Sequence, residues 1–280
     1  MYSILLSPAI LKAHLDDPDW VVVDCRFSLS DTDAGRRAYA AGHIPGAWYA
    51  HLDEDLSGEV VKGQTGRHPL PEIDQIAATF SRWGIGPGVQ VVAYDDMGGA
   101  MAARLWWLLH WLGHDAVAVL DGGWPGWIQS EYPVSLDLPQ RAPREFRPDP
   151  RPEAWADAGL VDLVRQDPEY VVVDSRAPER YRGEVEPIDP VAGHIPGAVN
   201  LPHFSNVGPD GRFLPREVLF ERFVDMLKGR DPSHVIFYCG SGVTAAHNLL
   251  AMEHAGLAGG KIYPGSWSEW ITDPDHQVAP

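Results

Sequence analysis

The sequence predicts an α/β protein of two domains, each with a mainly parallel sheet flanked by helices. Its 280 residues are more than one average domain needs. The chain also repeats itself: the tetrapeptide VVVD at residues 21–24 returns at 171–174, and AGHIPGA at 41–47 returns at 192–198. Strand-like and helix-like patterns alternate in both halves, which indicates parallel strands connected by helices. The repeat therefore indicates a duplicated α/β domain.

The later part of each half continues the repeat and sets the expected domain limits. Tyr94-Asp95 corresponds to Tyr238-Cys239, so only the second copy carries a cysteine at this place. The copies are offset by about 150 residues at their starts and about 143 at their ends, a period too long for a solenoid. Residues 137–153 contain five prolines and little apolar periodicity, as linkers do. We expect a first domain at 1–140, a linker at 141–152 and a second domain at 153–280.

Apolar runs with little polar alternation predict strands that are buried on both faces. These runs cover residues 20–25, 90–94, 116–120, 170–174 and 234–238. Helical periodicity is found between them, at residues 71–83, 99–112, 215–228 and 243–254. The first and third of these helices open on a proline, which the first helical turn tolerates. Residues 187–191 and 206–212 are expected to form loops.

Charge and composition exclude several classes of function. The formal net charge is −17 with no run of Lys or Arg, which disfavours nucleic acid and anionic membranes as partners. A small anionic substrate would therefore need arginines within the site itself. Residues 1–15 lack the basic start and cleavage site of a signal peptide, and residues 105–112 are too short to span a membrane. With one cysteine in each half, we expect a cytoplasmic protein.

Cys239 is the strongest candidate for chemistry. It follows a predicted buried strand and precedes a helix that begins near Val243, at the sheet edge where α/β proteins bind ligands. Gly240 and Gly242 allow the backbone to curl so that successive N–H groups converge, and the helix adds its positive end. Such a loop favours the thiolate, which is the nucleophilic form of cysteine.

Other conspicuous residues are interpreted as structural. Cys25 lies inside a predicted strand and corresponds to Ser175, so we expect a small buried side chain. His43 and His194 occur in both copies of the GHIPG turn, including the copy without a cysteine, and are expected to bind the backbone. Four repeated tryptophans are expected to anchor the cores: Trp124, Trp127, Trp267 and Trp270.

The paired VVVD strands, the paired GHIPGA turns and the single CGSGVTA loop at 239–245 resemble the tandem-domain rhodaneses. This family contains the thiosulfate and 3-mercaptopyruvate sulfurtransferases. The resemblance implies two tandem rhodanese-like domains, the first inactive, with Asp95 or Asp96 in place of the nucleophile. It also implies that Cys239 takes sulfur from a small anionic donor as a persulfide and passes it to cyanide or a thiol, for example on a thioredoxin-like protein. No cofactor or metal is expected.

The resemblance also implies how the donor is bound. Thiosulfate enzymes tend to have basic residues after the cysteine, whereas CGSGVTA is typical of the 3-mercaptopyruvate enzymes, so we favour 3-mercaptopyruvate over thiosulfate. Family members of that type hold the donor with two arginines, whose planar groups fit a carboxylate. Arg180 matches the first; the second falls at Ile188, which leaves Arg182 as the alternative. The loop residues expected to contact the donor are Gly240, Gly242, Val243 and Thr244.

A Ser-His-Asp set is also implied by the resemblance. Ser241 matches its serine, His68 its histidine and Asp53 its acid, with Glu54 and Asp55 close to the last position. A histidine from the first domain, oriented by a carboxylate, is a sensible proton carrier for a site in the second domain.

Two other classes of function are considered. Cysteine-dependent phosphatases of the same fold need an arginine near the end of the loop, where this chain has Ala245, Ala246 and His247. A non-catalytic binding module is the other alternative. The intact Cys239 with its glycines argues against it.

Overall fold

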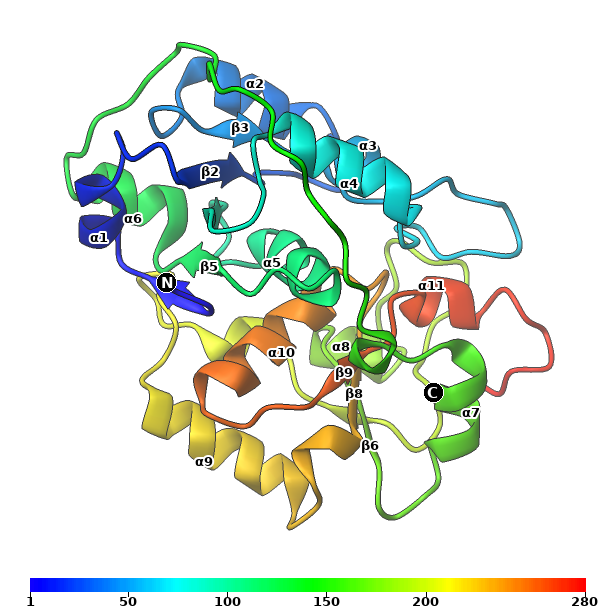
Figure 1. Cartoon of the computed structure of the whole chain (residues 1–280). Coiled ribbons are helices and arrows are strands. Elements are labelled where there is room, and N and C mark those ends of the chain that lie inside the picture. Colours follow the sequence, from blue (N-terminus) through cyan, green and yellow to red (C-terminus); the bar gives the residue numbers. More distant parts are fainter. The chain divides into compact units, whose positions relative to one another are not determined.

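The structure is a computed structural model that describes all 280 residues. It divides into two compact units (Figure 1). The first unit contains residues 1–58, 71–151 and 207–213, and the second contains 59–70, 152–206 and 214–280. Residues 59–70 lie in the first half of the sequence but belong to the second unit. His68 is therefore part of the unit that contains Cys239.

The first unit is built on a five-stranded parallel sheet in the order β1-β5-β4-β2-β3. The strands are β1 Leu5–Leu6, β2 Trp20–Asp24, β3 Trp48–Tyr49, β4 Gln90–Tyr94 and β5 Val117–Leu120. Val21 pairs with Val91 in the centre of the sheet. The inner strands are buried at nearly every position, which explains why their sequences are continuous apolar runs.

Six helices complete the first unit, and one of them is buried almost all round. They are α1 Pro8–Ala13, α2 Ala34–Ala41, α3 Leu52–Asp55, α4 Ile73–Arg82, α5 Ala102–Trp111 and α6 Gly123–Gln129. In α5 only His110 is not buried, whereas α4 buries one face. The apolar residues of α5 are thus buried inside the protein. None of the helices in the structure has the length and apolar run that crossing a bilayer requires.

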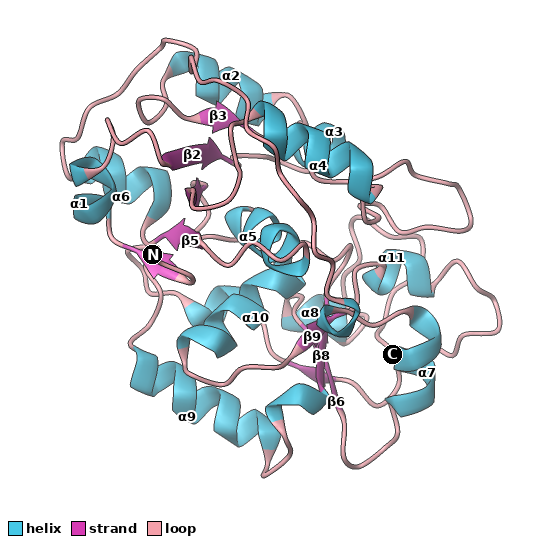
Figure 2. Ribbon diagram, in the orientation of Figure 1, coloured by secondary structure: helices cyan, strands magenta, loops and turns pink.

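The second unit has a four-stranded parallel sheet in the order β7-β6-β8-β9. The strands are β6 Val171–Asp174, β7 Val199–Asn200, β8 Val235–Tyr238 and β9 Lys261–Ile262. The helices are α7 Ala158–Val164, α8 Pro178–Tyr181, α9 Arg216–Leu227, α10 Thr244–His254 and α11 Ser266–Trp270, with 3-10 turns at Pro152–Ala154, His203–Asn206 and Pro232–His234. Figure 2 shows α9 and α10 on one side of this sheet and α7 and α11 on the other. The inner strand β8 leads directly to Cys239.

The VVVD strands and GHIPG turns are parts of one repeated framework. Arg26 forms a bidentate pair with Asp24, through Nε to Oδ1 and Nη2 to Oδ2, and donates to Gly42 O at 2.7 Å. In the second unit Arg176 pairs with Asp174 and donates to Gly193 O at 2.6 Å. Each arginine thus ties the end of its VVVD strand to its GHIPG turn. All four side chains are buried, and a buried charge is costly unless it has a partner. Each arginine therefore has a carboxylate beside it.

The residues that the sequence analysis interprets as structural are buried, partly buried or bound to the backbone. His43 Nδ1 lies 2.9 Å from Tyr39 O, and His194 Nδ1 lies 2.8 Å from Tyr181 O, so both imidazoles bind the backbone as expected. Cys25 is buried, as expected for a strand end. The tryptophans also belong to the cores: Trp127, Trp267 and Trp270 are fully buried and Trp124 is partly buried.

Candidate active site

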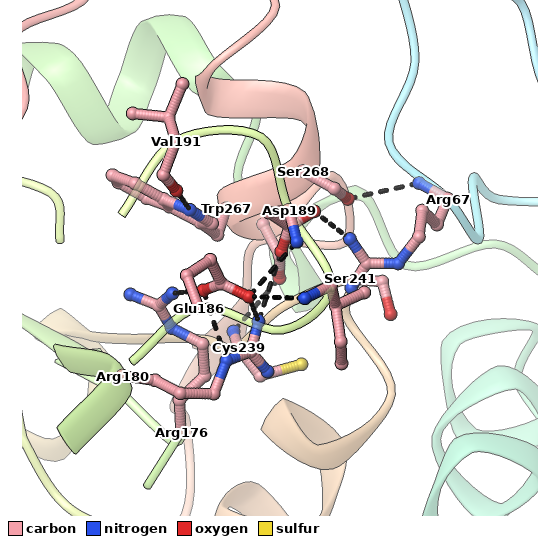
Figure 3. A network of polar contacts seen from close by, with 12 residues as sticks. Arg67, Arg176, Arg180, Glu186, Asp189, Val191, Cys239, Ser241, Trp267 and Ser268 are labelled. Atoms are coloured by element: carbon pink, nitrogen blue, oxygen red, sulfur yellow. Dashed lines mark hydrogen bonds and ion pairs between the residues drawn. The ribbon is translucent and has the colours of Figure 1, made fainter. Parts of the chain in front are cut away.

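The Cys239 loop connects β8 to α10 and is tied to the start of α11 (Figure 3). The N–H of Cys239 donates to Ser266 Oγ at 3.1 Å, and its carbonyl accepts from the N–H of Trp267 at 3.0 Å. The next carbonyl, Gly240 O, accepts from the N–H of Ser268 at 3.0 Å. These hydrogen bonds to residues 266–268 hold the loop in its curved conformation through the protein's own groups.

The sulfur of Cys239 accepts a backbone hydrogen bond from its own loop. The N–H of Gly242 donates to Cys239 Sγ at 3.1 Å, and only 2% of the cysteine is exposed. Gly242 has φ = 78°, and a Cβ there would collide with Pro264 O, so only glycine fits. An N–H directed at sulfur makes a stronger hydrogen bond to an anionic sulfur, such as that of a persulfide, than to a neutral one. The loop is therefore built to hold negative charge at this position.

The corresponding loop of the first unit holds a negative charge of its own. Asp95 stands at the place of Cys239: its carbonyl accepts from the N–H of Trp124 at 2.7 Å, as Cys239 O accepts from Trp267. The Asp95 carboxylate accepts four backbone N–H groups at 2.7–2.8 Å. The donors are Met97, Gly99, Met101 and Ala102. The turn after this strand is thus an anion cradle in the first unit, and the protein fills it with its own carboxylate.

His68 and Ser241 meet in the second unit. His68 Nδ1 lies 2.7 Å from Ser241 Oγ, and both side chains are buried. They are 173 residues apart in the sequence, and the contact exists because residues 59–70 join the second unit. The serine lies two residues after Cys239. The pair therefore combines an imidazole and a hydroxyl beside the loop of the cysteine.

Asp53 belongs to α3 of the first unit, so its part in the set stays a prediction. Its two neighbours already have ionic partners. Glu54 pairs with Arg36 at 2.8 Å, and Asp55 pairs with Arg82 at 3.3 Å. Burial raises the pKa of Asp53, and His51 opposes that rise.

Two arginines meet one buried carboxylate beside the cysteine loop (Figure 3). Arg180 donates to Glu186 at 2.7 Å and to Asp189 Oδ2 at 3.1 Å. Arg67 forms an ion pair with Asp189 Oδ1. Burial raises the pKa of Asp189, while Arg67 and Arg180 oppose that rise. Asp189 therefore bridges two guanidinium groups that come from distant parts of the chain.

Sequence reasoning missed Arg67, although it directly precedes the predicted His68. The other predicted arginine, Arg182, is about half exposed and pairs with Glu184 at 2.7 Å. Of the predicted loop residues, Val243 is the buried N-cap of α10 and Thr244 is its first residue. Gly240 and Gly242 lie in the loop on either side of Ser241, and the N–H of Gly242 donates to Cys239 Sγ. Donor binding by Arg180, Arg182 and these loop residues stays a prediction.

Comparisons with known proteins agree with this architecture. The model of the rhodanese-like domain matches residues 7–130 and again 158–273. A Pseudomonas aeruginosa protein named "Probable 3-mercaptopyruvate sulfurtransferase" is 49% identical over 276 residues, covering 98% of this chain and 97% of that protein. The "Thiosulfate/3-mercaptopyruvate sulfurtransferase 2" of Arabidopsis thaliana is 32% identical over 289 residues, covering 95% of this chain and 83% of that protein.

A solved structure gives the same result in three dimensions. SseA of Escherichia coli, described as having the rhodanese fold of 3-mercaptopyruvate sulfotransferases, superimposes with a TM-score of 0.83 at 29% identity. The match covers 96% of this chain and all of that one. The predicted fold class, two tandem α/β domains with parallel sheets, is therefore confirmed. The chain belongs to the rhodanese family, and within it to the two-domain sulfurtransferases.

Proposed function

We propose that this enzyme transfers sulfur from 3-mercaptopyruvate to a thiol or cyanide through a persulfide on Cys239. The observation that carries the proposal is the Gly242 N–H directed at Cys239 Sγ in a neutral loop. The names of its relatives support the donor, since one is named for 3-mercaptopyruvate alone and another for both donors. Thiosulfate is the second candidate donor.

The transfer has two steps. The Cys239 thiolate attacks the sulfur of 3-mercaptopyruvate, the new S–S bond forms, and the donor's C–S bond breaks with its electron pair on carbon. The resulting enolate takes up the proton that the donor's thiol carried, which gives pyruvate and the persulfide anion. A thiol or cyanide then attacks the outer sulfur, and the S–S electron pair returns to Cys239 as a thiolate. Backbone N–H groups of the loop serve the persulfide as an oxyanion hole serves oxygen.

We assign the proton transfer to His68 and Ser241. Their contact at 2.7 Å permits a proton to pass between the hydroxyl and the imidazole. In this assignment they carry the donor's thiol proton towards the carbon of the enolate. Asp53 is the proposed carboxylate that orients the imidazole, as in other serine-histidine-acid sets.

The remaining assignments concern the whole chain. We propose that residues 1–140 form an inactive first domain, that 141–152 link the domains and that 153–280 form the catalytic domain. The Asp95 carboxylate supports this inactivity because it is not a nucleophile for sulfur and fills its own cradle. We also propose a cytoplasmic location, supported by the two free cysteines, and a thioredoxin-like protein as one thiol acceptor.

Steady-state kinetics with each donor and cyanide as acceptor test the proposal, with Cys239→Ser as the blank. We expect a higher kcat/KM for 3-mercaptopyruvate than for thiosulfate and no turnover by the variant. A higher kcat/KM for thiosulfate would overturn the choice of donor. Turnover by Cys239→Ser would overturn the mechanism, and no turnover by the wild type would favour a binding module.

A further inference from the structure

Gly240, next to the nucleophile, faces two guanidinium groups across its missing side chain. A Cβ built on Gly240 would lie 2.9 Å from Arg67 Nη2 and 3.5 Å from Arg180 Nη1. The two arginines come from different segments, at residues 59–70 and in α8, yet both belong to the second unit. A glycine at 240 therefore leaves a surface next to Cys239 at which an anion would meet two cations.

Both arginines keep donors that the protein does not use. Arg67 binds Asp189 through Nη1, and its Nε is buried without a hydrogen-bond partner. Arg180 binds Glu186 and Asp189 through Nε and Nη2. The nitrogens nearest Gly240, Arg67 Nη2 and Arg180 Nη1, are thus not the ones engaged by these carboxylates. Buried donors are normally paired, so the partnerless Nε of Arg67 is an exception within this ion-pair cluster.

The backbone holds Arg67 in place independently of its side chain. The N–H of Arg67 donates to Ser268 Oγ at 3.1 Å, and the N–H of Ser268 donates to Gly240 O at 3.0 Å. Residue 67 is thereby connected through one serine to the residue after the nucleophile. Its side chain is 27% exposed, whereas that of Asp189 is 4% exposed. Arg67 is therefore a guanidinium held at the edge of the site with part of its surface accessible.

We propose that Arg67 binds the donor's carboxylate together with Arg180, and that Asp189 occupies the two guanidinium groups when no donor is bound. The inference rests on 3-mercaptopyruvate being the donor, since that molecule carries a carboxylate beside its carbonyl. A planar guanidinium binds a carboxylate through two parallel hydrogen bonds, which a lysine cannot reproduce. The net charge of −17 makes such local cations necessary for any anionic donor.

The competing explanation is that Arg67 only neutralises Asp189 and fastens residues 59–70. A purely structural arginine would affect the stability of the unit but not the affinity for small carboxylates. Arg182 is the competing donor-binding residue, because it lies two residues after Arg180. Its guanidinium pairs with Glu184, and both side chains are more than half exposed. These explanations predict different binding results and are separated by the experiment below.

The experiment measures KM for 3-mercaptopyruvate and Ki for pyruvate, the product that keeps the carboxylate and carbonyl. Variants are Arg67→Gln, Arg67→Lys and Arg182→Gln, with Arg165→Gln as the matched control. Arg165 pairs with Asp162 in the same unit and has only 10% of its side chain exposed. We expect Arg67→Gln to raise both constants by about tenfold to a hundredfold, the loss of one charge-assisted pair. Arg67→Lys should give a smaller rise, and Arg165→Gln no change.

Two further measurements separate binding from folding. The double variant Arg67→Gln/Asp189→Asn removes both charges but keeps a hydrogen-bonding pair, so it covers the case in which Arg67→Gln does not fold. Discharge of a preformed persulfide to dithiothreitol, a neutral thiol, should keep its wild-type rate in every folded variant. A folded Arg67 variant with unchanged KM and Ki would overturn the proposal, as would a rise confined to Arg182→Gln. If 3-mercaptopyruvate is not the donor, the wild type itself will release no pyruvate from it. That result is distinct from one in which only the role of Arg67 is wrong.

Discussion

The side chains of Asp95 and Cys239 accept backbone hydrogen bonds at equivalent positions of two copies of one loop. Asp95 accepts four, whereas Cys239 Sγ accepts one, from Gly242. The first copy thus satisfies its converging N–H groups with its own carboxylate side chain. The second copy has a smaller side chain at that place, which suits a loop whose negative charge changes during a reaction. The duplicated domain shows both solutions in a single chain.

Asp95→Asn should destabilise the first unit. An amide offers one oxygen to four donors and directs its NH₂ at the others, so some buried N–H groups lose their acceptor. We expect a loss of about 2–4 kcal/mol in the free energy of unfolding, measured with urea. Asp96→Asn is the control because Asp96 is exposed. Equal stability of Asp95→Asn and wild type would show that the four hydrogen bonds to Asp95 do not stabilise the unit.

His68 and Ser241 should behave as one kinetic unit. We expect Ser241→Ala, His68→Gln and the double variant to lower kcat for 3-mercaptopyruvate by a similar factor, about a hundredfold. The reason is that a proton path through two groups is lost when either is removed. Steady-state kinetics of the three variants test this. Effects that multiply in the double variant would show that the two residues act separately.

Alanine at the two loop glycines should have different consequences. In Gly240→Ala the methyl group displaces the end of Arg67, a flexible side chain, so we expect a higher KM for the donor in a stable protein. In Gly242→Ala the methyl group meets the backbone carbonyl of Pro264 at a φ of 78°, so we expect lower stability and loss of activity. Melting temperatures and KM values distinguish the two. A strongly destabilised Gly240→Ala would contradict this assignment.

Asp189→Asn should increase the affinity for small carboxylates. The wild-type Asp189 carboxylate occupies Arg67 and Arg180, and a bound anion must compete with it. Removing its charge should lower the Ki of pyruvate severalfold. Isothermal titration with pyruvate gives the dissociation constant directly. A weaker affinity in Asp189→Asn would mean that Asp189 positions the arginines for binding and does not compete with the ligand.

Much of the fold was predictable because the inner strands are buried on both faces. Residues 90–94 were predicted as a strand with the observed limits, and α10 begins one residue later than predicted. The two-residue edge strands, such as β1 and β7, were missed because they are too short to produce a pattern. Short helices such as α8 were missed for the same reason.

The site was predictable only where local sequence determines it. Gly240 and Gly242 beside Cys239 identify the loop without any structure, because their backbone demands are local. Arg67 and Asp189 are 122 residues apart in the sequence, and no local sequence pattern predicts a contact over that separation. Its recruitment depends on residues 59–70 joining the second unit, which is a property of the tertiary fold. His68 was found through a family resemblance, not through its own surroundings.

The most direct test of the central claim is mass spectrometry of the protein after reaction with 3-mercaptopyruvate in the absence of an acceptor. We predict a mass gain of one sulfur atom, located by peptide analysis on Cys239, together with release of pyruvate. Cys25→Ser should gain the same sulfur, because Ser175 already occupies the equivalent buried position in the second unit. Cys239→Ser should gain none. Added sulfur on Cys25, or in Cys239→Ser, would contradict the account.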